Sequence, residues 1–156
     1  MIFQNARVLT FDSALVDSDL EVTGSIHAEI YFSCDCRDTD LWVRLLDLAP
    51  DGSALNLMSP GLDVQRASYR DMARGRQLLA PSEVYKIELT HLITSNVFQK
   101  GHRVRVQIST TFFPNFSRNL QTGESEAASA RMQKATVSIY TDRDHQSRIL
   151  LPVVKK

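Results

Sequence analysis

Hydrophobic and polar residues alternate along much of the chain, and this period of two is typical of half-buried β-strands. In the segment His102–Ile108, the apolar residues Val104, Val106 and Ile108 alternate with arginine and glutamine. We expect these three side chains to face a core and the intervening polar ones to face solvent. Gly101 stands directly before the segment and suits a turn, because glycine adopts backbone angles that other residues avoid.

Other segments have the same character and are separated by turn residues. They are Arg7–Phe11, Ser25–Cys34, a hairpin from Asp40 to Met58 with its turn at Pro50–Gly52, Leu62–Tyr69, Glu83–Thr90, Lys134–Thr141 and Arg148–Val154. The segment Glu124–Ala135 is predicted to be a short helix or a polar loop, and no long amphipathic helix is predicted. Strands without intervening helices indicate an all-β sandwich or jelly roll. We expect a single domain over residues 1–156.

The alternation also predicts which side chains form the core. The predicted core positions are Ile26, Ala28, Ile30, Phe32, Leu41, Val43, Leu45, Val84, Ile87 and Leu89, and the return strand of the hairpin is expected to hold Leu55 and Leu57. Hydrophobic residues make up 43% of the chain and charged residues 23%. These proportions are those of an ordinary globular protein.

The charge balance and the apolar runs exclude several classes of protein. The 18 basic and 18 acidic residues give a formal net charge of zero, which removes the electrostatic argument for a nucleic-acid or membrane-surface partner. No apolar run approaches the roughly 20 residues of a membrane helix. The first residues do not resemble a signal peptide, so we expect a cytoplasmic location. No glycine-rich phosphate loop is present, and we expect no cofactor.

The chain carries few groups in the arrangements that catalysis needs. The pentapeptide Gly123–Ala127 places Ser125 like the nucleophile of a G-x-S-x-G elbow. That motif requires a buried strand before the serine, and the preceding residues here are polar. No two histidines have the spacing of a metal-ligand pair, and we interpret all of them as structural. The histidines are His27, His91, His102 and His145. A triad assembled from distant residues remains open.

Two short patterns resemble metal ligands, and both have a simpler interpretation. Asp35, Asp38 and Asp40 are spaced like ligands of a hard cation. The glycine and later glutamate of an EF-hand are missing, so we interpret them as turn residues that accept backbone hydrogen bonds. Cys34 and Cys36 lack a second pair of metal ligands, and a disulfide between residues so close would be strained. We therefore expect reduced thiols near a strand end and no metal site.

The most unusual segment is Thr110–Asn119. Phe112, Phe113 and Phe116 flank a proline there, and Arg118 follows. Aromatic side chains in a loop are costly to leave in water. They either fold back under the sandwich as a plug of the core or dock on another surface, and the sequence leaves both alternatives open.

Several motifs in a fixed order resemble one known family. The motifs are Asp19–Gly24, Asp38–Leu57, Tyr69–Arg70, Thr94–Ser109, Phe113–Gly123 and His145–Val154. Together they resemble the C-terminal domain of the X-Pro dipeptidyl-peptidase-like serine hydrolases. That group includes cocaine esterase, the α-amino-acid ester hydrolases and the glutaryl cephalosporin acylases. The resemblance extends from about Arg7 to Val154.

The resemblance implies a jelly-roll β-sandwich of the galactose-binding-like type without catalytic residues. In the family this domain follows an α/β-hydrolase domain that carries the Ser-His-Asp triad, packs against it, helps to shape its cleft and takes part in oligomer contacts. We therefore expect an upstream α/β-hydrolase domain as partner, and a homodimer formed through an exposed strand edge or through the loop Phe112–Phe116. The residues expected at interdomain or partner surfaces are Phe112, Phe113, Phe116, Arg118, His102 and Arg103. For His102 and Arg103 the alternative role is the organisation of the neighbouring loop.

Two other hypotheses remain. The second is a stand-alone carbohydrate or small-ligand binding module that uses Tyr69 and Phe116. Trp42, the only tryptophan, is predicted to lie in a strand, which is a poor position for a sugar platform. The third is a self-contained enzyme with a triad drawn from distant residues, and it lacks both an elbow and a metal-ligand constellation.

Overall fold

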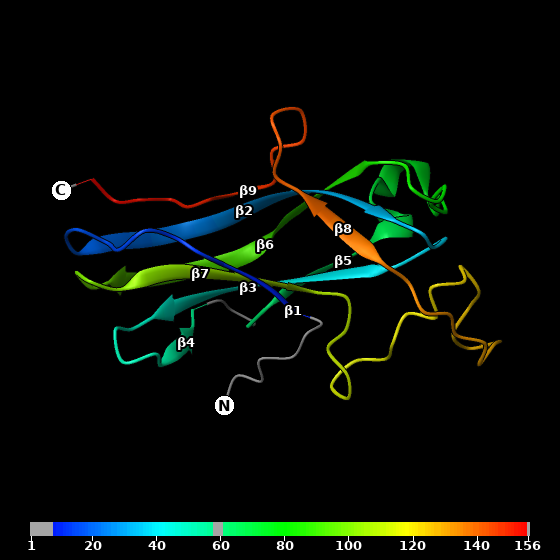
Figure 1. Cartoon of the computed structure of the whole chain (residues 1–156), viewed down its shortest axis with the longest axis horizontal. Coiled ribbons are helices and arrows are strands. Elements are labelled where there is room, and N and C mark those ends of the chain that lie inside the picture. Colours follow the sequence, from blue (N-terminus) through cyan, green and yellow to red (C-terminus); the bar gives the residue numbers. More distant parts are fainter. Residues whose placement is uncertain (1–7, 58–60, 156) are drawn as a thin grey trace.

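Two antiparallel β-sheets pack face to face in the computed structural model, which describes residues 8–57 and 61–155 (Figure 1). The five-stranded sheet has the order β1 (Val8–Asp12), β7 (Arg103–Ser109), β3 (Asp40–Leu48) and β4 (Ala54–Asn56), and β5 (Asp63–Arg66) also pairs with β3. The four-stranded sheet has the order β6 (Tyr85–Phe98), β2 (Leu20–Cys34) and β8 (Val137–Tyr140), and β9 (Arg148–Leu150) also pairs with β2. Two short 3-10 helices, η1 (Ala67–Tyr69) and η2 (Met72–Arg74), follow β5. The predicted all-β sandwich is confirmed.

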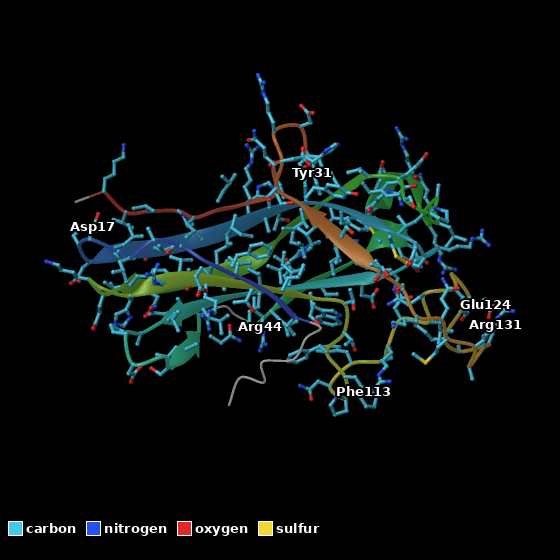
Figure 2. The ribbon with its side chains drawn as sticks, viewed as in Figure 1. Asp17, Tyr31, Arg44, Phe113, Glu124 and Arg131 are labelled. Atoms are coloured by element: carbon cyan, nitrogen blue, oxygen red, sulfur yellow. A yellow bond between two sulfur atoms is a disulfide. The ribbon has the colours of Figure 1, made fainter. Side chains whose placement is uncertain are left out.

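The core lies between the sheets, where side chains from both fill the layer (Figure 2). The predicted core positions of β2 and β3 are confirmed. These residues, Ile26, Ala28, Ile30, Phe32, Leu41, Val43 and Leu45, are at most 2% exposed. Period-two alternation succeeds because successive side chains of a strand point to opposite faces of its sheet.

The longest strand pair, β2 with β6, contains an irregularity that the alternation did not predict. Ile26 lies opposite Leu92, whereas Ala28 lies opposite Leu89, so β6 carries an extra residue at this point. Such a bulge lets Leu89 and Leu92 both face the core although they are three residues apart. The core position predicted for Val84 is wrong, because Val84 precedes β6 and is 37% exposed.

Strand β7 follows its predicted alternation with one difference. Ile108 is 4% exposed, and Val104 and Val106 pack against the core clusters. Gly101 has a φ of 86° in the turn before the strand, as predicted. Gln107 faces away from the core and is nevertheless buried. Its amide is satisfied there, because the Arg44 guanidinium donates a hydrogen bond to its Oε1 at 3.0 Å.

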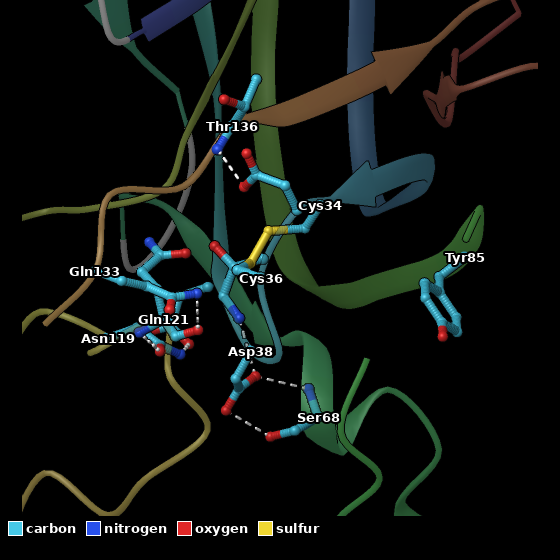
Figure 3. The surroundings of a disulfide bond; sticks show 12 residues. Cys34, Cys36, Asp38, Ser68, Tyr85, Asn119, Gln121, Gln133 and Thr136 are labelled. Carbon is cyan, nitrogen blue, oxygen red and sulfur yellow. Dashed lines mark hydrogen bonds between the residues drawn. A yellow bond between two sulfur atoms is a disulfide. The ribbon is translucent and has the colours of Figure 1, made fainter. Parts of the chain in front are cut away.

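The two cysteines form a disulfide, so the expectation of reduced thiols is wrong (Figure 3). Strand β2 ends at Cys34, and the chain bends through residues 35–37 before β3 begins. The bend places the Cα atoms of Cys34 and Cys36 5.1 Å apart. Two residues of a straight strand span roughly 6.6 Å. Spacing along the sequence does not predict the bend that brings the sulfur atoms together.

The remaining segments connect the sheets. Residues 110–136 cross from β7 to β8 without a strand, and Glu124–Ala135 is a loop with one turn rather than a helix. The first predicted strand begins at Val8, and Arg7 lies outside the described residues. Within the described ranges, no helix is long and apolar enough to cross a membrane.

Candidate functional site

The residues predicted for a contact surface fall into two groups at opposite ends of β7. His102 and Arg103 lie where the strand begins, and the aromatic loop Phe112–Arg118 follows its end. The strand has seven residues, which span roughly 23 Å when extended. The two groups therefore cannot form one compact site.

Two of the loop phenylalanines cover a tryptophan on the outer face of the five-stranded sheet. Trp42 belongs to β3, and its ring centroid lies 4.7 Å from that of Phe116 and 6.0 Å from that of Phe112. Trp42 is only 6% exposed as a result. Phe112 packs on this outer face and belongs to neither core cluster, so it is not a plug of the core. Phe116 packs on Trp42 and remains 49% exposed.

Phe113 and Arg118 form the outer surface of the same loop. Phe113 is 57% exposed, and the Arg118 guanidinium lies 4.3 Å from its ring centroid. Figure 2 shows Phe113 at the end of the loop, away from both sheets. In the part of the chain that the structure describes, the Arg118 side chain has no hydrogen bond or ion pair. An exposed aromatic ring with an unpaired guanidinium is a combination enriched at protein interfaces.

A buried polar network fixes the base of this loop. Asp40 accepts hydrogen bonds from the Arg66 guanidinium at 2.9 Å and from the Asn119 amide at 3.0 Å. Arg66 also donates to Glu126 at 2.6 Å. The hydrogen bond to Asp40, more than that to Glu126, holds the pKa of Arg66 above its ordinary value. The exposed aromatic rings therefore stand on a well-anchored segment.

Asp38 organises the neighbouring turn (Figure 3). Its carboxylate is 1% exposed and accepts hydrogen bonds from the backbone N–H of Thr39 and from the N–H and hydroxyl of Ser68. Asp35 instead accepts from the Thr136 N–H. Asp35 and Asp38 thus accept backbone hydrogen bonds, as the turn interpretation expects. For Asp40 that interpretation is wrong, because Asp40 lies in β3 and accepts from the side chains of Arg66 and Asn119.

His102 and Arg103 hold the chain segment after β1. His102 Nδ1 lies 2.8 Å from the Asp47 carboxylate, and the histidine side chain is 17% exposed. Arg103 donates to the Ser13 carbonyl at 2.5 Å, and the Val16 N–H donates to the His102 carbonyl at 2.9 Å. These contacts serve loop organisation, one of the two roles expected for these residues.

A cavity of about 470 Å³ lies beside the aromatic loop. Trp42 and Phe116 form an apolar wall, and Asp63 and His91 contribute polar groups. The Asp63 carboxylate accepts hydrogen bonds from the backbone N–H groups of Val64 and His91. The sequence did not predict this cavity, because Asp63 and Phe116 are far apart along the chain.

The catalytic alternatives gain no geometric support. The Ser125 hydroxyl accepts a hydrogen bond from the Ala127 N–H, and residues 110–124 directly before it contain no strand. Each histidine ring lies 2.8–3.9 Å from a different carboxylate, in the pairs His27–Glu88, His91–Asp63, His102–Asp47 and His145–Asp142. Among the described residues, no serine or threonine hydroxyl is hydrogen-bonded to a histidine ring. A nucleophile with its general base is therefore missing from this part of the chain.

One cluster of possible metal ligands was missed in the sequence. Side-chain atoms of His27, Glu29 and Glu88 lie within 4.8 Å of one another, because Glu29 is directly opposite Glu88 in the β2–β6 register. Both carboxylates already form ion pairs with basic side chains of the protein. Arg148 pairs with Glu29 and lowers its pKa, and Lys86 pairs with Glu88 at 2.6 Å. Predicting this cluster requires the pairing register of β2 and β6, which the spacing of residues along the sequence does not give.

Comparison with known proteins identifies one family over nearly the whole chain. Residues 2–150 match the profile of the X-Pro dipeptidyl-peptidase C-terminal non-catalytic domain. The cocaine esterase of Rhodococcus sp. (strain MB1 Bresler) is 34% identical over 151 residues, which are 96% of this chain and 26% of that protein.

Solved structures give the same result. An aminopeptidase from a marine sediment archaeon, Thaumarchaeota archaeon, superposes with a TM-score of 0.89 at 25% identity, over 97% of this chain and 26% of the aminopeptidase. An α-amino acid ester hydrolase superposes with a TM-score of 0.84 at 29% identity, over 95% of this chain and 26% of the hydrolase. The chain thus spans about a quarter of the length of the relatives it matches.

Proposed function

The chain belongs to the family of X-Pro dipeptidyl-peptidase C-terminal non-catalytic domains, and we propose that it is the accessory β-sandwich of a longer serine hydrolase acting on esters, amides or X-Pro dipeptides. The observation that carries the proposal is the match of almost the entire chain to one quarter of a cocaine esterase. The separate histidine–carboxylate pairs, none with a bonded hydroxyl in the described ranges, support a non-catalytic role.

The sandwich contributes packing, cleft shape and assembly contacts in this proposal. Its upstream α/β-hydrolase partner docks on the exposed outer part of the aromatic loop, formed by Phe113, Phe116 and Arg118. The polar network around Asp40 supports this assignment, because an anchored loop loses little conformational entropy when it binds. Aromatic and arginine side chains also dominate the binding energy of many interfaces.

A hydrolysis assay tests the non-catalytic role. We expect the purified chain to show no turnover of p-nitrophenyl esters or of X-Pro p-nitroanilides above that of a heat-denatured sample. The Ser125→Ala variant is the matched control, and it is expected to behave like the wild type. Ester turnover by the wild type that disappears in Ser125→Ala would contradict the proposal.

A second candidate function rests on the cavity beside Trp42. Its volume of about 470 Å³ falls in the range of small-molecule pockets, and its walls combine aromatic rings with the carboxylate of Asp63. The chain would then bind a small sugar or another small organic ligand. Trp42 is the only tryptophan, so its fluorescence reports on this cavity alone. A saturable change during titration with a sugar panel, lost in Asp63→Asn, supports this function, and a flat response counts against it.

Self-association is a further part of the proposal. Within the described residues, β1 has β7 as its single strand neighbour. A strand with one free edge can pair with another chain. We propose a homodimer that uses this edge rather than the aromatic loop, which is left for the upstream hydrolase domain.

A further inference from the structure

The cavity beside the aromatic loop contains a buried carboxylate that has no lysine or arginine partner in the part of the chain that the structure describes. Asp40, a comparable buried aspartate, forms an ion pair with Arg66 at 2.9 Å. Asp63 is 7% exposed, and the only ring or cation near its carboxylate is the imidazole of His91 at 3.4 Å. A buried carboxylate is costly to keep without a cation beside it. Asp63 is therefore suited to receive a positively charged ligand.

A β-bulge helps to fix this carboxylate at the cavity wall. The extra residue of β6 lies between Leu89 and Leu92, and His91 belongs to this bulge. Its backbone N–H donates to one carboxylate oxygen of Asp63 at 3.2 Å, and the Val64 N–H donates to the other at 2.8 Å. Bulges are frequent beside functional sites, where they redirect individual groups. The two backbone donors orient the carboxylate and leave its negative charge uncompensated.

Three aromatic rings form the opposite side of the cavity. Trp42, Phe112 and Phe116 all belong to its wall, and their ring centroids lie 4.7 to 6.2 Å from one another. The face of an aromatic ring attracts a cation within about 6 Å of its centroid. The cluster already makes one such contact, because the Arg44 guanidinium lies 5.4 Å from the Phe112 centroid. Arg44 is not part of the cavity wall, so Phe116 and Trp42 remain for a ligand.

The combination of rings and carboxylate selects one class of ligand. A metal ion needs several oxygen ligands, and Asp63 is the only carboxylate in the described wall of the cavity. A neutral ligand would leave the charge of Asp63 without a partner. An organic ammonium ion satisfies both sides, because its charge pairs with the carboxylate and its carbon atoms contact the rings.

We propose that this cavity binds a small organic ammonium ion, with the charged nitrogen near Asp63 and the apolar substituents against Phe116 and Trp42. The proposal rests on the second candidate function, small-ligand binding, and names the chemical class of the ligand. The volume of about 470 Å³ accommodates a compound of this kind.

An NMR titration with choline tests the proposal. Trp42 is the only tryptophan, so its indole N–H gives a single signal that reports on the cavity. We expect a saturable shift of this signal with a dissociation constant on the order of 1 mM. The matched probe is neopentylcarbinol, in which a carbon atom replaces the charged nitrogen of choline. At constant ionic strength, this neutral alcohol is expected to bind at least tenfold more weakly.

Removal of the carboxylate charge tests its role directly. Asp63→Asn keeps the size of the side chain and an acceptor for the backbone N–H groups. It is expected to weaken choline binding about tenfold or more and to leave the binding of neopentylcarbinol unchanged. Asp17→Asn removes the same charge from an exposed position, and it is expected to bind choline like the wild type.

A second substitution keeps the test valid if Asp63→Asn disturbs the fold. Phe116→Leu retains an apolar side chain and removes the ring, so it is expected to weaken choline binding about threefold or more. Phe113→Leu changes a ring of the same loop that is outside the cavity wall, and it is expected to have no effect. Circular dichroism verifies that each variant is folded.

The outcomes separate this proposal from the functions on which it depends. Equal binding of choline and neopentylcarbinol overturns it, and so does choline binding that neither Asp63→Asn nor Phe116→Leu weakens. A response to the sugar panel without a response to choline also overturns it and leaves the small-ligand function in place. A flat response to choline and to the sugars contradicts both. The non-catalytic role is unaffected by any of these results, because the hydrolysis assay tests it.

Discussion

Phenylalanine occupies two contrasting environments in this protein. Phe32 and Phe98 are completely buried between the sheets, whereas Phe113 is 57% exposed and Phe116 49% exposed on the loop after β7. The first pair fills the core, and the position of the second pair depends on a polar network at the base of the loop. The comparison shows that the same side chain is completely buried in one region and about half exposed in the other.

The largest effect is expected from removing a core ring. Phe32→Ala should lower the free energy of unfolding by about 3–5 kcal/mol, because it leaves a cavity between well-packed sheets. Phe116→Ala, which loses the ring contacts with Trp42 and Phe112 on the outer face, should cost about 1 kcal/mol. Urea unfolding followed by circular dichroism measures both. Equal losses in the free energy of unfolding would show that the loop ring contributes as much to stability as the core ring, which contradicts this account.

The next effect concerns the anchor of the loop. Asp40→Ala should cost about 2 kcal/mol, because it leaves the Arg66 guanidinium and the Asn119 amide without their shared acceptor. Asp17→Ala changes an exposed aspartate and is the control. We also expect hydrogen exchange to accelerate in the backbone of residues 112–120 in Asp40→Ala only. Unchanged exchange there would show that the aromatic contacts alone hold the loop.

A smaller effect is expected from pH. The hydrogen bond from Arg105 holds the pKa of Asp12 below its ordinary value of 3.8. A lowered pKa in the folded state means that the stabilisation is present above pH 3.8 and is lost as the pH falls through the lower folded value. The pair is partly exposed, so the loss should stay below about 1 kcal/mol. Urea midpoints at pH 6 and pH 3, measured at low protein concentration, should differ less in Asp12→Asn than in the wild type.

The smallest effect on stability is expected at the most exposed ring. Phe113→Ser should change the free energy of unfolding by less than about 0.5 kcal/mol, because little of the ring is buried. It should also reduce the binding of the hydrophobic dye ANS at pH 7, since an exposed aromatic surface is lost. A loss of stability comparable to that of Phe116→Ala would show that Phe113, like Phe116, is packed against the protein rather than exposed on its surface.

The sequence predicted the parts of the fold that depend on local alternation. Positions such as Ile30, Phe32 and Leu41 were identified as core residues, because a strand with one buried face repeats every two residues. Val84 was misplaced because alternation does not show where a strand begins. The disulfide was missed because it depends on the bend after β2.

The candidate contact surface was predicted only in part, because its residues meet through packing between distant segments. The aromatic segment was recognised from its composition, and its attachment to Trp42 was not, because these residues meet only through the packing of the loop on β3. His102 and Arg103 were grouped with it although β7 keeps them apart. The exposure of Leu9 and Phe11 on β1 could not be predicted, since alternation marks an inward face without showing what covers it.

The central claim is that this sandwich is the non-catalytic part of a longer serine hydrolase, and the coding DNA upstream of Met1 tests it most directly. We predict an in-frame extension of domain length, roughly 100 residues or more, that encodes an α/β-hydrolase domain with a G-x-S-x-G elbow after a strand. A stop codon followed by a ribosome-binding site directly before Met1 would contradict the claim, and the small-ligand module would then become the leading function.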